Sequence, residues 1–182
     1  ATTNKNMTWD LDIPLASWTQ AGYMGTVTVA TVYVPTGFKS LNILGNCIIS
    51  NGVWTHVTNV ATEANRLSVT VGGNLTIDTG GQINVDGKGY GRGRGFIGLH
   101  SDYGNGYGMS GSHGGKGGYY STSAAGPTYG SITSPTNLGS GGGSGYVSEG
   151  GGAVRLIVTG TTTVKGIISA QGLNVGEGGG AG

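Results

Sequence analysis

Residues 87–95 read GKGYGRGRG, a stretch whose cationic and aromatic side chains could bind a ligand. Glycine occupies every second position, and Lys88, Tyr90, Arg92 and Arg94 stand between the glycines. A phosphate-binding loop of the Walker type needs Gly-Lys followed by Ser or Thr at the start of a helix. Glycine follows Lys88 instead, and no helical pattern comes after it. The stretch therefore does not predict a nucleotide phosphate site.

Arg92 and Arg94 beside Tyr90 could also stack on the bases and bind the phosphates of a single-stranded nucleic acid. Such binding requires several clustered cations, whereas the whole chain has a formal net charge of +1. A strand places alternate residues on opposite faces, so the glycines would share one bare face that another backbone can approach closely. We therefore predict a structural ribbon at residues 87–95 and no nucleic-acid partner.

Tyrosine side chains give the sequence its best signal of a binding surface. Seven of the nine tyrosines lie in the glycine-dense residues 88–152. A tyrosine ring is apolar on its face and forms hydrogen bonds at its tip, which suits contact with a sugar or a partner surface. The alternative is that the rings pack over glycine surfaces and hold the segment together. The candidate contact residues are Tyr90, Arg92, Arg94, Tyr103, Tyr107, Tyr119 and Tyr120.

Two pairs of acidic residues have positions that could serve polysaccharide cleavage. Asp10 and Asp12 would share one face of a strand, and Asp78 and Asp86 lie near the corners of successive strands. Glycoside hydrolysis needs two carboxyl groups about 5 to 9 Å apart, and eliminative cleavage needs several Asp around Ca²⁺. The eight acidic residues include no group of three, and the three histidines and one cysteine lack metal-ligand spacing. We therefore predict no catalytic residue, cofactor or metal site; the alternative is a fragment of a polysaccharide lyase or hydrolase.

The composition is rich in glycine and poor in charge. Glycine accounts for 41 of the 182 residues and charged residues for 9%, against a usual charged share of about 25%. The surface must therefore draw its polarity from Ser, Thr, Asn and Tyr. No run approaches the ~20 apolar residues of a membrane span, and the lone Cys47 cannot form an internal disulfide.

The elements that would hold these residues are β-strands, because apolar residues recur at every second position. This alternation is present at residues 25–34, 66–87 and 153–172, where Gly, Asn or Asp separates short runs. Aligned at Gly73 and Gly160, the last two segments match once two residues are removed at the corner. The alignment pairs Leu75 with Thr162, Ile77 with Val164, Ile83 with Ile168, Val85 with Ala170 and Gly87 with Gly172.

Self-similar runs of short strands with apolar residues in register indicate a solenoid, in which each repeat stacks on the next. We predict an all-β, right-handed parallel β-helix, with an antiparallel β-sandwich as the alternative. Residues 1–182 would form a single domain. Its expected parts are an N-terminal cap at 1–24, rungs at 25–87 with an early rung at 41–50, a Gly/Tyr-rich insertion at 88–152, and a rung at 153–182 that begins a further glycine-rich segment.

Four motifs resemble a glycine-rich module that recurs in large secreted and cell-surface proteins, mostly of bacteria. They are SHGGKGG (112–118), YGS (129–131), LGSGGG (138–143) and GGGAVRLIVTGTTTVKGIISAQG (150–172). In that family the last motif is a β-helix rung that follows a glycine-rich excursion, and the resemblance covers roughly residues 67–182. It implies a parallel β-helix and an extracellular or cell-surface location, and it carries over no catalytic residues.

These observations favour a non-catalytic structural or adhesive module, either part of a surface protein or the subunit of a self-assembling filament. A β-helix has open ends, whose unpaired backbone groups can add another chain. The expected partners are copies of the same chain, stacked head to tail, or adjoining segments of a larger parent protein. The alternative from another class is a carbohydrate-binding module of a larger secreted protein, with a polysaccharide as its partner.

Overall fold

The computed structural model describes residues 5–34, 37–95, 98–99, 112–115, 128–131, 133, 135–142 and 148–173. All regular structure among these residues is β-strand, and none of them is helical. The predicted all-β class is therefore confirmed. The described residues include no long apolar helix of the kind that crosses a membrane.

The chain forms two compact units. Unit 1 comprises Ala1–Val57, Asn65–Asn84 and Val154–Ser169. Unit 2 comprises Thr58–Ala64, Val85–Ala153 and Ala170–Gly182. Unit 1 contains two parallel sheets, and unit 2 is held mainly by backbone hydrogen bonds between glycine-rich segments.

Ten of the described strands belong to the two parallel sheets of unit 1. The larger sheet consists of β1 (Met7–Trp9), β2 (Trp18–Gln20), β3 (Thr26–Val29), β7 (Cys47–Thr55), β9 (Leu75–Asn84), β13 (Thr162–Val164) and β14 (Ile167–Ser169). The smaller sheet consists of β6 (Leu41–Ile43), β8 (Leu67–Val71) and β12 (Val154–Val158). Two antiparallel strand pairs are also present among the described residues: β4 (Tyr33–Val34) with β5 (Gly37–Phe38), and β10 (Arg94–Gly95) with β11 (Gly98–Leu99).

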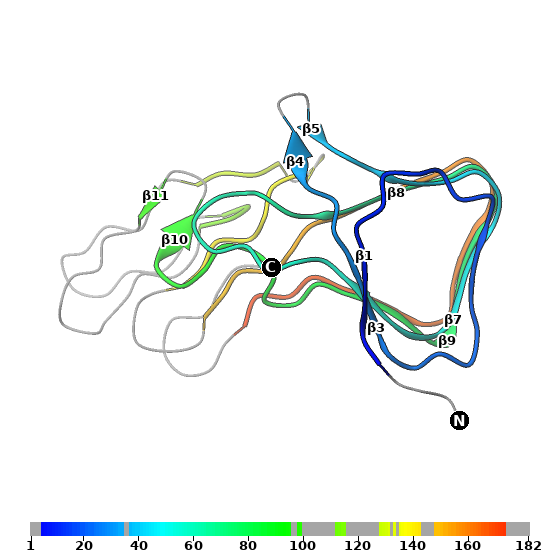
Figure 1. Ribbon diagram of the computed structural model, residues 1–182. Coiled ribbons are helices and arrows are strands. Elements are labelled where there is room, and N and C mark those ends of the chain that lie inside the picture. The colour runs from blue at the N-terminus through cyan, green and yellow to red at the C-terminus, as the bar shows by residue number, and fades with distance from the viewer. Residues whose placement is uncertain are drawn as a thin grey trace. The chain divides into compact units, whose positions relative to one another are not determined.

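The chain visits the two sheets of unit 1 in turn. Each pass runs through the smaller sheet and then the larger one, and the next pass stacks on it in parallel register. Figure 1 views unit 1 along this stacking direction, so that strands of successive passes, such as β7 and β9, overlap. Stacked residues such as Asn46 and Asn74 are 28 residues apart in the sequence. We call a set of strands or residues stacked through successive passes a column.

The observed register confirms the alignment predicted from the sequence. The observed pairs are Leu75 with Thr162, Ile77 with Val164, and Ile83 with Ile168. The earlier pass expected at residues 41–50 is also confirmed, because Cys47 pairs with Leu75 and Ile49 with Ile77. Every ladder in the two sheets is parallel, so the alternative of an antiparallel sandwich is wrong for them.

The core of unit 1 consists of the alternate apolar residues of each pass. Because adjacent strands lie about 4.8 Å apart, each side chain covers the one before it in its column and removes it from water. The core residues of these columns are at most 4% exposed: Val27, Val29, Leu41, Ile43, Cys47, Ile49, Leu67, Val69, Val71, Leu75, Ile77 and Ile83. Burial raises the pKa of the Cys47 thiol to about 12, so this cysteine is the inert core residue that the sequence indicated.

Asparagine side chains hold the corner between the smaller and the larger sheet. Asn46 Oδ1 accepts a hydrogen bond from Asn74 N at 2.9 Å, and Asn74 Oδ1 accepts one from Thr161 N at 2.8 Å. Glycine precedes this corner because a Cβ at Gly72 would lie 2.3 Å from Leu44 O. Close backbone stacking and side-chain acceptors for the turn amides therefore keep successive corners aligned.

Aromatic packing closes the first passes of unit 1. The ring of Trp18 makes edge-to-face contacts with Trp9 at 5.5 Å and with Trp54 at 5.2 Å between centroids. Trp54 Nε1 donates a hydrogen bond to Gln20 Oε1 at 2.8 Å, and Gln20 Nε2 donates one to Asn51 O at 2.8 Å. Trp54 is thus a buried indole whose N–H is satisfied, and it fills the core of the first passes.

Candidate functional site

The glycine-alternating stretch 87–95 is not the extended strand that its sequence predicts. The backbone turns at Gly87 and again at Arg92–Gly93, and the two glycines have φ of 63° and 66°. A φ in this range favours glycine because a Cβ would clash with the backbone. The stretch is therefore a folded loop of unit 2, and only Arg94 and Gly95 within it belong to a strand, β10.

The middle of this loop is nevertheless a structural element, because its successive amides bind three different segments. The bonds are Gly89 N to Gly150 O (2.7 Å), Tyr90 N to Gly139 O (3.0 Å) and Gly91 N to Val60 O (2.9 Å). In a β-strand, neighbouring amides point to opposite sides, whereas an extended chain with three residues per turn sends them in three directions. This loop thus links three other segments of unit 2 through its backbone.

Glycine is required where these backbones meet. A Cβ on Gly89 would lie 2.2 Å from Gly151 O, and a Cβ on Gly150 would lie 1.9 Å from Gly139 O. The expected role of the glycines, a bare surface for another backbone, is confirmed at these positions, although the strand that was to supply it is absent. Segments packed this closely satisfy one another's buried backbone groups by hydrogen bonds.

Tyr90 lies inside unit 2 and packs against neighbouring rings. It is 3% exposed, and its ring lies 6.5 Å from that of Tyr129, which in turn is 5.1 Å from the ring of His113. Burial, followed by the nearby carboxylate of Glu63, raises the pKa of Tyr90 to about 12. Burial also raises the pKa of Tyr129, whose hydroxyl donates a hydrogen bond to Leu138 O at 2.8 Å. These phenols therefore remain neutral packing groups at physiological pH.

The other predicted contact residues are only partly described. Arg92 is exposed and Arg94 half-buried, and Arg94 N donates a hydrogen bond to Gly91 O at 3.1 Å within the turn. The remaining candidates, Tyr103, Tyr107, Tyr119 and Tyr120, lie outside the described residues. Contact by the arginines and by these tyrosines stays a prediction.

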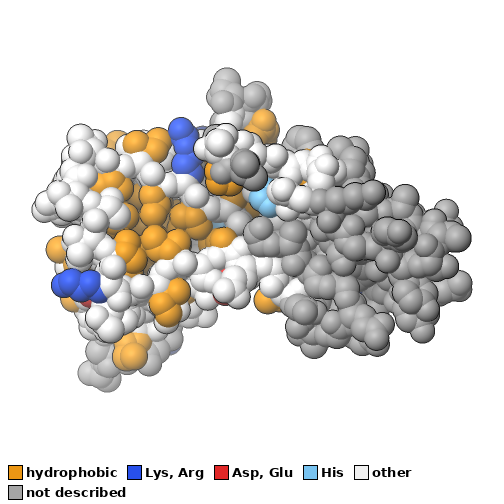
Figure 2. Space-filling view, turned by 180° about the vertical axis from the view of Figure 1, so that it is seen from behind, with side chains coloured by type: hydrophobic (Ala, Val, Ile, Leu, Met, Phe, Trp, Pro, Cys, Tyr) orange, Lys and Arg blue, Asp and Glu red, His pale blue; other side chains and the backbone are white. Residues whose placement is uncertain are grey.

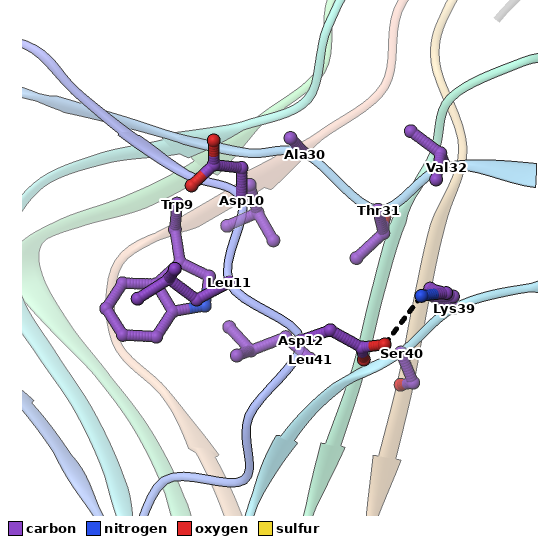
Figure 3. Close-up of a pocket in the computed structure, with 11 residues that line it drawn as sticks. Trp9, Asp10, Leu11, Asp12, Ala30, Thr31, Val32, Lys39, Ser40 and Leu41 are labelled. Carbon is purple, nitrogen blue, oxygen red and sulfur yellow. Dashed lines mark hydrogen bonds and ion pairs between the residues drawn. The ribbon is translucent and has the colours of Figure 1, made fainter.

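The first acidic pair lies beside a small pocket of unit 1. The pocket has a volume of about 90 Å³ and is lined by residues of three segments, among them Trp9, Asp10, Asp12 and Lys39. Figure 3 shows the carboxylates of Asp10 and Asp12 pointing away from each other, with Asp12 directed at Lys39. Lys39 Nζ and Asp12 Oδ2 are 2.5 Å apart. The two carboxylates therefore border the same pocket but do not face each other across it.

The second acidic pair serves local structure. Asp78 Oδ2 accepts a hydrogen bond from Ser50 Oγ at 2.8 Å, and its other oxygen lies 3.8 Å from Lys165 Nζ. Asp86 Oδ1 accepts a hydrogen bond from Gln171 N at 2.6 Å, a contact between two segments far apart in the sequence. Among the described residues, no group of three His, Cys, Asp or Glu could hold a metal ion.

The last pass of unit 1 presents core positions to solvent. Val164 stacks on Ile77, which is 0% exposed, yet Val164 is 46% exposed; Ile168 stacks on Ile83, also 0% exposed, yet is 43% exposed. Figure 2, the view from behind, shows hydrophobic side chains gathered over this end of unit 1, with Lys or Arg at its rim. We call the outer side of β12, β13 and β14 the open end.

The outer strand edges are the second feature of the open end. No described strand pairs with the outer edges of β12, β13 and β14. Leu75 N donates to Thr161 O, and Lys165 N donates to Ile77 O. Because bonded residues alternate along a parallel ladder, the N–H groups of Thr162 and Val164 point away from β9.

The open end thus combines exposed core side chains with a strand edge that no described strand covers, which is the arrangement that adds another strand. Sequence alternation correctly predicted that these side chains face the interior of a stack. It did not identify the open end, because exposure depends on whether another layer covers them. No protein-family model matches the chain, and no curated protein or solved structure matches it either.

Proposed function

We propose that this chain is a non-catalytic structural module of an extracellular or cell-surface assembly, built as a parallel β-helix that accepts further strands at its open end. One observation carries the proposal: Val164 and Ile168 continue buried columns but are 46% and 43% exposed. A strand added there would pair the free backbone edge and bury both side chains. Addition of a strand to a sheet edge supplies main-chain hydrogen bonds and needs no catalytic group.

The described polar groups support a structural role. Asp12, Asp78 and Asp86 each bind a neighbouring side chain or amide of their own unit. Tyr90, the one candidate sugar-contact tyrosine that the structure describes, is buried. The alternative of a carbohydrate-binding module thus gains no support from Tyr90.

Replacing Thr162 by proline tests strand addition at the open end. The N–H of Thr162 points away from β9, so Thr162→Pro should leave the existing ladder intact and remove one donor from the free edge. We expect the unchanged chain to associate in sedimentation velocity as its concentration rises, and we expect elongated particles in electron micrographs. Thr162→Pro should remain monomeric at the same concentrations.

Thr162→Val is the matched control, since it keeps the N–H and favours a strand. It should associate as the unchanged chain does. Circular dichroism must show that all three proteins retain the same β-sheet content. Equal association of the proline variant and the unchanged chain would contradict addition at this edge.

A further inference from the structure

The two ends of the stack in unit 1 do not have the same outline. The first column contains Leu15, β6, β8 and β12, and the second contains β2, β7, β9 and β13. The third column contains β3, β7, β9 and β14, and it also contains β1, which pairs with the outer edge of β3. The third column therefore has five levels, whereas the other two have four, counting Leu15 as one level of the first; the extra level, β1, lies at the end opposite the open end.

Resting on the proposed function, we infer that the open end of one copy binds a second copy of this chain head to tail. The second copy contributes Leu15, β2 and β3 to the contact. β1 of the second copy must be displaced for this contact to form. When Leu15 and β2 of the second copy stack on β12 and β13 of the first copy, β3 of the second copy continues the third column of the first. The position that β1 occupies then coincides with β14 of the first copy. In its observed position β1 therefore blocks stacking, and its displacement permits stacking.

The exchange of β1 for β14 conserves the apolar contact over Val27, although it gives up the edge-to-face contact of Trp9 with Trp18. Met7 of β1 pairs with Val27. Ile168 occupies the same column as Val27, through Ile83 and Trp54. In the contact between copies, Ile168 therefore takes the place of Met7 over Val27. One apolar side chain is replaced by another, and Met7, which is 39% exposed, has less contact to lose than a fully buried residue.

The ends also carry complementary charge in the first column. Arg155 is exposed on β12 and pairs with Ser68, whose hydroxyl lies 3.4 Å from that of Ser40 in the pass before. Asp12 lies at the next level of this column, beside Lys39 and Ser40, as Figure 3 shows. In a head-to-tail contact Arg155 of one copy meets Asp12 of the next. The carboxylate would then lie between two cations, Lys39 and Arg155, instead of one.

A recess beside β1 marks where the second column would be extended. It has a volume of about 200 Å³, and its lining includes Met7, Trp18, Gln20 and Val27. Gln20 stands in the same column as Ile49, Ile77 and Val164. Continuing that column brings the exposed Val164 of one copy onto the β2 level of the next.

Disulfide trapping between two variants, each with one added cysteine, tests the register. Thr19 and Thr163 share the second column, and both are exposed. Directly stacked residues lie within the Cα separation that a disulfide allows. A mixture of Thr19→Cys and Thr163→Cys should give a linked dimer on a non-reducing gel. Cys47 does not compete, since it is buried.

A second set of mixtures reports whether β1 has moved. Ser169→Cys should link to Thr28→Cys when β1 is displaced, but to Thr8→Cys when β1 stays and itself meets β14. We expect the Thr28 pair to form and the Thr8 pair not to form. A predominant Thr8 product overturns the inference. Thr19→Cys with Ser169→Cys, from different columns, is the control that should give no product.

Removal of β1 tests directly whether β1 blocks stacking. If β1 is displaced in a tenth of the molecules or fewer, a variant lacking residues 1–9 should associate about tenfold more tightly or better. Met7→Pro removes the N–H that β1 donates to β3 and should also tighten association. The N–H of Thr8 points away from β3, so Thr8→Pro should leave association unchanged.

The outcomes separate the two proposals. Association of the intact chain and the β1 variants with equal affinity leaves the proposed function standing and overturns the role of β1. Absence of association in all of them overturns both. Association without the Thr19 and Thr163 product, in variants that retain their β-sheet content, overturns the head-to-tail register.

Discussion

Ile83 and Ile168 offer a matched test of the open end, because they are the same residue type in adjacent layers of one column. Ile83 is 0% exposed and Ile168 43% exposed. Truncating a buried isoleucine to alanine costs about 2–5 kcal/mol, so Ile83→Ala should destabilise unit 1 by that amount. Full burial of such a side chain is worth about 1.5–3 kcal/mol. Since Ile168 is only about half buried, Ile168→Ala should cost the dilute protein roughly 1 kcal/mol.

The assay is urea unfolding at a protein concentration below the onset of association, followed by the fluorescence of the tryptophans in unit 1. A change in midpoint at constant slope reports the difference in stability. At high concentration the cost of Ile168→Ala should rise toward that of Ile83→Ala, because the added layer buries this position. A dilute-protein cost for Ile168→Ala as large as that for Ile83→Ala would refute the reasoning, since it would mean that the open end is already covered.

Three further predictions concern the glycine contacts, the corners and the buried thiol. Gly89→Ala places a Cβ 2.2 Å from Gly151 O and should lower the thermal midpoint of unit 2, whereas Gly115→Ala, with nothing within 4 Å, should be silent in the same calorimetric scan. Asn74→Ala removes the acceptor for Thr161 N and should lower the free energy of unfolding in urea by about 1–2 kcal/mol. Asn74→Asp keeps an acceptor oxygen and should retain most of that stability. Equal losses of stability in the two variants would contradict the corner hydrogen bond. The folded-state pKa of Cys47 is raised from 9.0 to about 12, so the thiol loses its proton at a lower pH in the unfolded state than in the folded state. The contribution of Cys47 to stability is therefore present below pH 9 and is lost as the pH rises toward 12. Cys47→Ala should flatten the fall in unfolding free energy between pH 9 and 11, and an unchanged slope would count against burial of the thiol.

The parallel register of unit 1 could be predicted because it depends on a local repeat. Leu75 and Ile77 match Thr162 and Val164 in spacing from the corner glycines, and a shift by one residue would turn every apolar side chain outward. The pattern therefore allowed one stacking register and specified the inward residues. The long separation between the two segments did not matter, since stacking depends on periodicity within each pass and not on the residues between passes.

The glycine-rich loop could not be predicted in the same way. An alternation of glycine with Lys88, Tyr90 and Arg92 has the period of a strand, but Tyr90 N and its neighbours bind three segments far apart in the sequence. Glycine permits both arrangements, so the choice depends on which backbones surround the loop. The burial of Tyr90 follows from the same neighbours, and no local signal distinguishes a packed tyrosine from an exposed one.

The energetics of the exchange at β3 decide which part of the open end must drive association. β1 and β14 each contribute three residues to a parallel ladder, so replacing one by the other leaves the number of hydrogen bonds at β3 nearly unchanged. The net gain must then come from the first and second columns, where β12 and β13 acquire partners on edges that no described strand pairs with. A change confined to β14 should therefore weaken association less than a change of the same kind in β13. This ordering distinguishes growth by layer addition from a simple exchange of terminal strands between copies, in which β14 and β1 alone would set the affinity.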